Sequence, residues 1–281
     1  MDTPNTDMTG RVAIVTGAAS GIGRATARMF AAAGAQVLAC DRSPAIADLA
    51  ADRIVPVEMD AGSEADVVSV IDRAMADFGR LDVFFANAGI TGGVREVADH
   101  TPDIWAEVLR INLIGPFLAV KHAAPKMGPG GVILATASVA GMRANAGPMA
   151  YSASKAGVIN MVQNAAYALA GTGVRINAIC PGLIETEMTR PIYDYARSYG
   201  AEPDGGGRVP LGRGGQPEEI SSVALFLASD MASYMTGQAV PVCGGMSASH
   251  PFGARPNPEE AARRIAEYRA GQAGRDVSLA E

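Results

Sequence analysis

Tyr151 and Lys155 are the two residues of this sequence whose types and spacing most clearly suggest chemistry. They stand four positions apart at the start of a segment of helical composition, so the phenol and the ammonium project from one face of a helix. A free tyrosine has a pKa of about 10, too high for a base at neutral pH. A neighbouring positive charge favours the phenolate and makes proton transfer feasible. Because such pairs also occur on ordinary helix surfaces, the prediction needs further residues.

Ser138 and Asn112 are polar residues in places where their side chains can join that pair. Ser138 directly follows the expected strand 132–137, at the sheet edge where folds of this kind bind ligands. Its hydroxyl could hold a carbonyl oxygen near Tyr151. Asn112 interrupts an apolar helical stretch, where a buried amide needs hydrogen-bond partners. The alternatives are a turn residue for Ser138 and a structural hydrogen bond for Asn112.

A glycine-rich turn, T-G-A-A-S-G-I-G over residues 16–23, separates the first expected strand from the first expected helix. Glycines there let the backbone approach a pyrophosphate closely, and the free N–H groups and positive dipole end of the helix bind its charge. The spacing G-x-x-x-G-x-G differs from the common dinucleotide pattern G-x-G-x-x-G. The predicted phosphate-binding residues are Gly17, Ser20, Gly21, Ile22 and Gly23.

Asp41 ends the second expected strand, where a carboxylate can accept hydrogen bonds from both ribose hydroxyls of an adenosine group. The same carboxylate would repel a 2′-phosphate, so NAD is favoured over NADP as the cofactor. Arg42 follows directly and could turn toward a 2′-phosphate instead, which keeps NADP open as the less favoured choice.

Short apolar runs alternate with longer helical patterns along residues 11–248. Apolar runs that are separated by helices indicate βαβ units, and right-handed crossovers place helices on both faces of a parallel sheet. The expected fold class is α/β, with a single Rossmann-like, doubly wound parallel sheet of about seven strands. The expected strands cover residues 11–16, 36–40, 54–59, 81–86, 132–137, 175–180 and 238–242. The expected helices cover residues 23–33, 63–78, 102–127, 151–170 and 217–227.

One catalytic domain is expected over residues 11–248, because no composition break divides it. A polar N-terminal arm, residues 1–10, precedes it. Within it, residues from about 183 to 215 are rich in glycine and polar side chains and are expected to form a lid loop. Residues 249–281 are charged and poor in large apolar side chains, and are expected to be a C-terminal extension.

The formal net charge is −6, with a pI of about 5.2. An acidic surface repels phosphate backbones, so nucleic acid is not an expected partner. The three cysteines and three histidines lack metal-ligand spacing, so no metal site is expected. No stretch approaches the ~20 apolar residues of a membrane span, and the N-terminus has no signal-peptide core. The expected location is the cytoplasm, without a membrane partner.

These motifs together, in this order, resemble the short-chain dehydrogenase/reductase family over roughly residues 8–248. The family's glycine turn corresponds to residues 16–23, and its N-A-G to residues 87–89. Its Y-x-x-x-K corresponds to residues 151–155, with Ser138 thirteen residues upstream. Its P-G-x-x-x-T corresponds to residues 181–186, and Asn112 falls at the family's helix asparagine.

The resemblance implies an oxidoreductase that interconverts a secondary alcohol and a ketone by hydride transfer to or from a nicotinamide cofactor. It implies that Tyr151 is the general acid/base and that Lys155 lowers its pKa and binds the nicotinamide ribose. Ser138 would orient the substrate, and Asn112 would support a water that passes the proton to solvent. The further cofactor contacts that it implies are Asp60, Ala61, Asn87, Gly89, Pro181, Gly182, Ile184 and Thr186. It also implies a homotetramer.

The substrate is expected to be a small molecule with an apolar or cyclic body. The pocket is expected to be lined by apolar side chains, and Arg143 and Asn145 are polar candidates near Tyr151. The apolar candidates are Met142, Met149, Met188, Ile192, Tyr193 and Tyr195. Steroids, cyclic alcohols, aryl ketones and 3-oxoacyl thioesters stay open. The alternatives are a 3-oxoacyl thioester reductase and a non-catalytic, cofactor-sensing regulator on the same fold.

Overall fold

The computed structural model describes residues 5–204 and 206–248, together with residues 263, 266 and 267. In this part of the chain a 7-stranded sheet has the order β3-β2-β1-β4-β5-β6-β7, and every neighbouring pair is parallel. The predicted α/β fold with a doubly wound parallel sheet is confirmed. The strands are β1 (Val12–Thr16), β2 (Gln36–Asp41), β3 (Ile54–Glu58), β4 (Val83–Ala86), β5 (Val132–Thr136), β6 (Arg175–Pro181) and β7 (Ala239–Val242).

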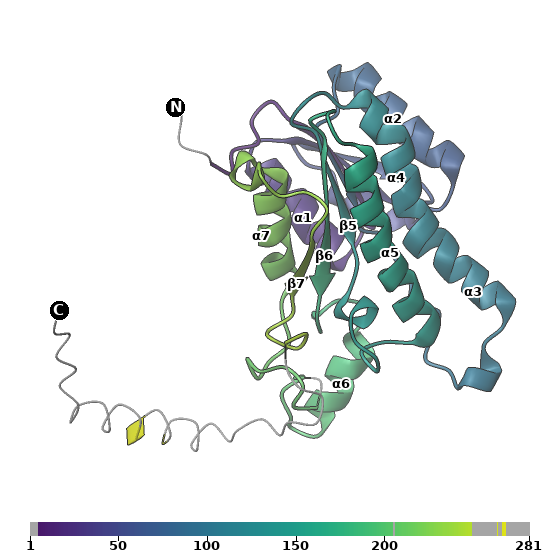
Figure 1. Cartoon of the computed structure of the whole chain (residues 1–281), viewed down its shortest axis with the longest axis vertical. Helices are drawn as coiled ribbons and strands as arrows, with labels where there is room; N and C mark the ends of the chain where they lie inside the picture. Colours follow the sequence, from purple (N-terminus) through teal and green to yellow (C-terminus); the bar gives the residue numbers. More distant parts are fainter. Residues whose placement is uncertain (1–4, 205, 249–262, 264–265, 268–281) are drawn as a thin grey trace, which may run out of the picture.

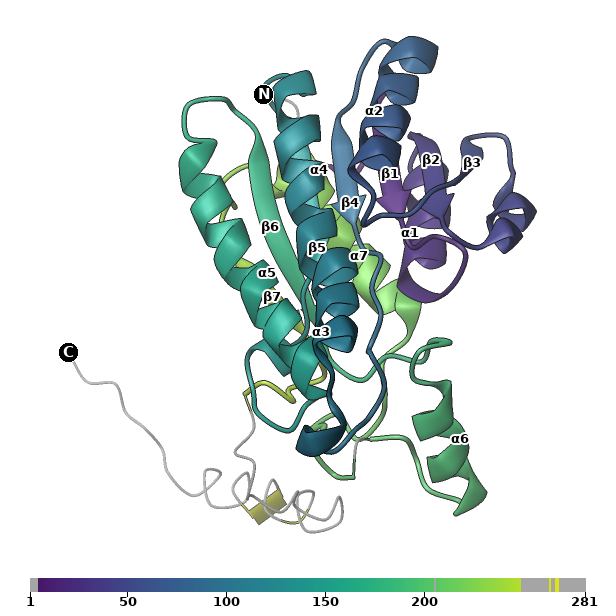
Figure 2. The ribbon, with the colours of Figure 1, turned by 90° about the vertical axis from the view of Figure 1, so that its right-hand side faces the viewer.

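Helices cover both faces of this sheet (Figures 1 and 2). α1 and α7 pack against each other on one face, and α2, α4 and α5 lie along the other. α6 lies apart from both layers, below the sheet in both views. The helices are α1 (Gly21–Ala32), α2 (Glu64–Phe78), α3 (Pro102–Leu109), α4 (Gly115–Ala123), α5 (Met149–Ala168), α6 (Arg190–Ser198) and α7 (Pro217–Ala228).

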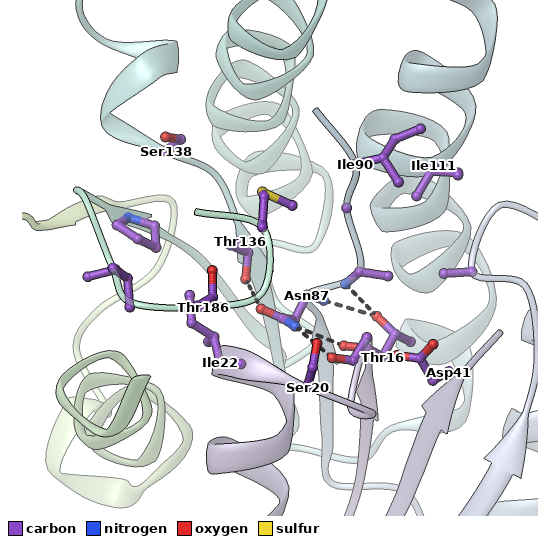
Figure 3. A pocket seen from close by; sticks show the side chains of 18 of the residues that line it. Thr16, Ser20, Ile22, Asp41, Asn87, Ile90, Ile111, Thr136, Ser138 and Thr186 are labelled. Atoms are coloured by element: carbon purple, nitrogen blue, oxygen red, sulfur yellow. Dashed lines mark hydrogen bonds between the residues drawn. The ribbon is translucent and has the colours of Figure 1, made fainter. Parts of the chain in front are cut away.

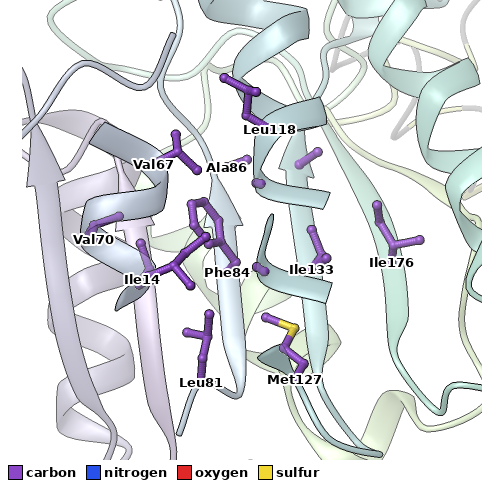
Figure 4. Close-up of a cluster of buried hydrophobic side chains, with 14 of the residues drawn as sticks. Ile14, Val67, Val70, Leu81, Phe84, Ala86, Leu118, Met127, Ile133 and Ile176 are labelled. Atoms are coloured by element: carbon purple, nitrogen blue, oxygen red, sulfur yellow. The ribbon is translucent and has the colours of Figure 1, made fainter. Parts of the chain in front are cut away.

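The core consists of two apolar layers, one on each side of the sheet. Ile14 and Phe84 face α2 and α4 (Figure 4), whereas their neighbours Val15 and Phe85 face α1 and α7. Because both faces are covered, the strands are continuous apolar runs and not alternating ones. Burying one such side chain contributes about 1.5–3 kcal/mol, so the strands give the site at their carboxyl ends a rigid base.

The helix predicted for residues 102–127 is not continuous. A π-helical turn, Arg110–Ile114, separates α3 from α4. Pro116 gives the physical reason, because it has no N–H and cannot bond to the carbonyl four residues earlier, that of Asn112. Such π turns often occur at functional sites. The other predicted helices and strands agree with the structure to within two residues.

The predicted lid loop, residues 183–215, has both ends fixed side by side. The Glu185 N–H donates to the Gly215 carbonyl at 2.9 Å, and the Gly215 N–H donates to the Leu183 carbonyl at 2.8 Å. α6 lies between these ends. The predicted C-terminal extension, residues 249–281, falls almost wholly outside the described residues. Within the described part of the chain, a search for a helix of membrane-spanning length and apolarity finds none.

Candidate active site

A cavity of about 300 Å³ opens where the loops after β1, β4, β5 and β6 meet (Figure 3). Most of the residues predicted from the sequence come together there, with the glycine turn and Asp41 toward one end and Ser138 toward the other. The predicted residues that line it are Gly17, Ser20, Gly21, Ile22, Asp41, Arg42, Asp60, Ala61, Asn87, Gly89, Ser138, Tyr151, Lys155, Pro181, Gly182, Ile184, Thr186 and Met188.

The glycine turn leaves no room for side chains where phosphates are expected. Gly17 has φ +68° and Gly21 has φ +50°, a region that favours glycine. A Cβ on Gly17 would lie 2.8 Å from Ala88 Cα, and one on Gly23 would lie 2.1 Å from the Gly17 carbonyl oxygen. Gly23 therefore packs beneath the turn and does not line the cavity. The turn leads into the N-terminus of α1, whose first N–H groups have no helical partner and suit a pyrophosphate.

Thr16 and Thr136, which were not predicted from the sequence as site residues, form hydrogen bonds that connect the ends of neighbouring strands (Figure 3). Thr16 Oγ1 accepts the backbone N–H of Asn87 at 3.0 Å, and Asn87 Nδ2 donates to the Thr16 carbonyl at 3.0 Å. Thr136 Oγ1 donates to Asn87 Oδ1 at 2.9 Å. These bonds join β1, β4 and β5, so they fix the floor of the cavity.

Asp41 is held at the end of β2 by backbone donors. Its Oδ2 accepts the Ala19 N–H at 3.0 Å, and its Oδ1 accepts the Ser43 N–H at 2.9 Å. The carboxylate is thus fixed beside the glycine turn, where the predicted ribose contact places it. Arg42 lines the same end of the cavity.

Asp60 lies at this same end and is paired with Arg110 at 2.8 Å. Its Oδ1 also accepts the Gly62 N–H at 2.8 Å. Burial raises the pKa of Asp60, but the bond from Gly62 and the Arg110 guanidinium together hold it below its usual value. This carboxylate therefore stays ionised at neutral pH.

Tyr151, Lys155 and Ser138 meet at the opposite end. Lys155 Nζ lies 5.5 Å from the centre of the Tyr151 ring and donates to the Thr136 carbonyl at 2.6 Å. The Ser138 side chain is close enough to the Tyr151 phenol to lower the pKa of that phenol. Ser138 caps a short 3-10 turn, where its Oγ accepts the Ala140 N–H at 3.1 Å.

Burial has the largest effect on the pKa values of Tyr151 and Lys155. It raises the pKa of Tyr151, although the hydrogen bond with Ser138 acts in the opposite direction. It also lowers the pKa of Lys155 to about 8. The expected lowering of the Tyr151 pKa is therefore not seen in the chain alone, because removing a phenolate from water outweighs the local hydrogen bond.

Asn112 does not line the cavity, because its side chain is fully buried beside it. Its Oδ1 accepts the Ile90 N–H at 2.8 Å, and its Nδ2 donates to the Ile90 carbonyl at 2.8 Å. A further bond runs from Nδ2 to Ser154 Oγ at 3.0 Å. Asn112 therefore joins the loop after β4 to α5, and the water that it is expected to support stays a prediction.

Two of the predicted substrate contacts are not among the residues that line the cavity. Arg143 Nε donates to the Ser247 carbonyl at 2.8 Å, and the Asn145 carbonyl accepts from Arg208 Nη1 at 3.1 Å. Both residues tie loops together and neither lines the cavity. Sequence spacing placed them near Tyr151, but it could not show which loops they join.

Among the six apolar candidates for the pocket, Met188 alone lines the cavity. Tyr193 is 2% exposed and packs inside the lid, with its hydroxyl donating to the Leu183 carbonyl at 3.4 Å. Lining residues that the sequence did not reveal come mainly from strand ends and their loops. They are Thr16, Cys40, Met59, Ala88, Ile90, Ile111, Thr136, Ala137 and Thr189.

The cavity thus offers carboxylates at one end, bare backbone in the middle and a phenol, a hydroxyl and an ammonium at the other. That order suits the ribose, pyrophosphate and nicotinamide of a dinucleotide. Across the described ranges no three His, Cys, Asp or Glu side chains are grouped to hold a metal ion.

Residues 17–247 match the family model described as enoyl-(acyl carrier protein) reductase. The 3-oxoacyl-(acyl-carrier-protein) reductase FabG of Thermotoga maritima is 39% identical over 246 residues, which cover 84% of this chain and 98% of that protein. The cis-4-hydroxycyclohexanecarboxylate dehydrogenase of Sinomonas cyclohexanicum is 39% identical over 246 residues, covering 85% and 97%.

A solved structure leads to the same family. The short-chain type dehydrogenase/reductase from Mycobacterium marinum has a TM-score of 0.78 and 32% identity, covering 87% of this chain and 98% of that one. Its fold agrees with the parallel sheet described above, and the cavity holds the glycine turn and the Ser–Tyr–Lys set that the sequence predicted. The chain belongs to the short-chain dehydrogenase/reductase family, the nicotinamide-dependent oxidoreductases that act on CH–OH groups.

Proposed function

We propose that this chain is an NAD(H)-dependent enzyme that interconverts a secondary alcohol and a ketone on an apolar or cyclic molecule, with Tyr151 as general acid/base. The observation that carries the proposal is the meeting of Ser138, Tyr151 and Lys155 in the cavity that also holds the glycine turn and Asp41. A regulator that only senses the cofactor has no need for this set, so its presence supports an enzyme over the regulator.

Each catalytic side chain has a distinct task in this proposal. The cofactor, when bound, supplies or accepts the hydride at the carbinol carbon. Ser138 holds the substrate oxygen against the Tyr151 hydroxyl, which lies beside it in the cavity. Tyr151 donates its proton to that oxygen during ketone reduction and removes it during alcohol oxidation.

Lys155 supplies the local positive charge in this arrangement. Its ammonium is fixed by the Thr136 carbonyl at 2.6 Å and faces the Tyr151 ring. Because burial raises the pKa of Tyr151, a phenolate needs more positive charge than the chain alone provides, and an oxidised nicotinamide ring is cationic. Proton removal by Tyr151 is therefore expected only with the cofactor in place.

The preference for NAD over NADP is supported by the fixed carboxylate of Asp41. Wild type is expected to favour NAD by tenfold or more in kcat/KM, and Asp41→Ala is expected to reduce that preference by about tenfold, or ~1.4 kcal/mol. The reason is that the variant loses the ribose acceptor and the charge that repels a 2′-phosphate, while Arg42 stays at the same end of the cavity. Initial rates with both cofactors measure the effect.

Asp48→Ala is the matched control, because Asp48 is an exposed carboxylate nearby that does not line the cavity. It removes the same charge and is expected to leave the cofactor preference unchanged. A wild type that prefers NADP would overturn the role given to Asp41.

The substrate class is supported by side chains at the cavity and by one relative. Met188 lines the cavity and is 44% exposed. Met142 and Met149 do not line it, but they are 42% and 45% exposed at either end of the loop that leads to Tyr151. Flexible thioethers of this kind adapt to bulky apolar groups. The relative from Sinomonas cyclohexanicum is named for a cyclic hydroxy acid. The FabG relative is named for a 3-oxoacyl thioester, which keeps that class as the second candidate.

A ketone panel with NADH tests the proposal. Cyclohexanone and bicyclic ketones are expected to give a kcat/KM at least about tenfold above that of acetoacetyl-coenzyme A, a difference that pocket contacts can supply. The reverse order would establish the thioester reductase instead. Tight NADH binding without turnover of any member would support the regulator.

The homotetramer and the cytoplasmic location stay predictions. Phe117 on α4 is 47% exposed and Tyr167 on α5 is 86% exposed. Apolar side chains on the outer faces of two neighbouring helices support self-association. Sedimentation of the purified chain would measure its assembly.

A further inference from the structure

Ser154 is a fully buried hydroxyl inside the catalytic helix α5, one residue before Lys155. Its Oγ donates to the backbone carbonyl of Tyr151 at 2.6 Å. The hydroxyl hydrogen is thereby used within the helix, so only the lone pairs of the oxygen face outward. One of them accepts from Asn112 Nδ2 at 3.0 Å.

This arrangement determines which way the Asn112 amide points. Both hydrogens of Nδ2 are used, one on the Ile90 carbonyl at 2.8 Å and one on Ser154 Oγ. Oδ1 accepts the Ile90 N–H at 2.8 Å. A rotated amide would place Oδ1 against the Ile90 carbonyl and against a hydroxyl that has no hydrogen left to give. Two acceptors facing each other without water are costly, so the Ile90 backbone sets the amide orientation and Ser154 adds a third hydrogen bond that holds it there.

The amide in turn fixes a loop at the nicotinamide end of the cavity. Ile90 lines this cavity (Figure 3), and Gly89 beside it approaches the catalytic helix closely. A Cβ on Gly89 would lie 3.3 Å from Asn112 Oδ1 and 3.5 Å from Lys155 Nζ. A shift of the loop by a fraction of an ångström would therefore change the surroundings of the Lys155 ammonium.

We propose that Ser154 is a positioning residue for the redox reaction, because its hydroxyl anchors the Asn112 amide to the catalytic helix and thereby helps to set the distance between the Gly89–Ile90 loop and Lys155. The inference rests on the proposed roles of Tyr151 and Lys155. Ser154 acts through Asn112 and touches neither substrate nor cofactor, since it does not line the cavity.

Ser154→Ala is expected to lower kcat about tenfold while the KM for NADH changes less than threefold. The lost hydrogen bond leaves one Asn112 N–H unsatisfied, but the glycine turn and Asp41 stay intact. If Ser154 acts only through Asn112, then Asn112→Ala/Ser154→Ala is no slower than Asn112→Ala alone, because two residues in one chain of bonds are not additive. Steady-state rates of wild type, the two single variants and the double variant form a double-mutant cycle. Measured from pH 6 to 10, they also show whether the pKa that governs kcat changes.

Ser221→Ala is the matched control. Ser221 is also fully buried in a helix, where its Oγ donates to the Pro217 carbonyl at 3.0 Å and pairs with Thr26 Oγ1 at 2.9 Å. Its loss is expected to lower the Tm to a similar extent without changing the pH profile of kcat. If Ser154→Ala folds poorly, Ser154→Cys serves instead. A cysteine has a side-chain volume close to that of serine, but its sulfur is a weaker acceptor for the Asn112 N–H, so the same fall in kcat is expected.

The outcomes separate the two proposals. A Tyr151→Phe enzyme that turns over like wild type would remove the proposed function and this inference with it. If Tyr151→Phe is inactive but Ser154→Ala merely loses Tm as Ser221→Ala does, only the inference fails. Additive losses in the double variant would likewise overturn it.

Discussion

Tyr151→Phe is expected to lower kcat about a thousandfold, within the range that a positioned general acid contributes. Phenylalanine keeps the ring that packs beside Lys155 but removes the hydroxyl that lies beside Ser138. Among the described residues no other phenol lines the cavity, so the variant leaves no second tyrosine there to donate the proton. The change is measured as kcat in both reaction directions at saturating cofactor, with NADH affinity from fluorescence titration expected to stay within threefold.

Tyr193→Phe provides the control for this substitution. Tyr193 is buried outside the cavity, and its hydroxyl bonds to a backbone carbonyl inside the lid. Its variant loses a comparable hydroxyl away from the cavity and is expected to keep kcat within about threefold. A Tyr151→Phe enzyme that retains more than a tenth of wild-type kcat would show that another group moves the proton.

The strand ends and the catalytic residues were predictable because local pattern determines both. Tyr151 and Lys155 share a helix face through their spacing alone, and Asp41 ends an apolar run that can only be a strand in this context. The distance in space between Asp41 and the Tyr151–Lys155 pair is not encoded in the local sequence. It follows from the sheet order, in which β1 lies between β2 and β4, and no local pattern in the sequence encodes that order.

The residues that the sequence missed depend on contacts across strands. Thr16 and Thr136 lie at the ends of β1 and β5 and meet only through Asn87 at the end of β4. No spacing in the sequence relates them, because the intervening helices set their separation along the chain. Pro116 was a local signal for the π-helical turn, since a proline inside a helical pattern breaks one backbone hydrogen bond.

Lys155 shows that catalysis and stability make opposing demands on the same side chain. A fully buried ammonium with one carbonyl partner is poorly compensated for the water that it loses. This explains why burial lowers its pKa from the usual 10.5 to about 8. A difference of that size corresponds to about 3 kcal/mol, which the folded chain bears whenever the lysine is protonated.

Lys155→Met is therefore expected to lower kcat at least a hundredfold and yet to stabilise the chain at pH 7. The expected gain is about 2 kcal/mol, because the lost hydrogen bond to Thr136 subtracts about 1 kcal/mol from the burial cost that is removed. Below pH 8 the lysine is protonated in both the folded and the unfolded chain, so the wild type bears the full cost. Between pH 8 and 10.5 the folded chain releases the proton first, and the unfolded chain binds more protons. Wild-type stability then rises with pH relative to the variant, and the advantage of Lys155→Met, about 2 kcal/mol at pH 7, vanishes near pH ~9.5.

Urea unfolding without added nucleotide, at pH 7 and at pH 10, measures this difference in the free energy of unfolding. Lys121→Met is the control, because Lys121 is a surface lysine whose ammonium pairs with Glu64 at 2.6 Å. Removing it is expected to change stability by less than about 1 kcal/mol, as for exposed ion pairs generally. If Lys155→Met proves less stable than wild type at pH 7, or if its advantage grows toward pH 10, then the buried ammonium is better compensated than its single carbonyl partner indicates. In that case Lys155 would serve the fold as well as the reaction.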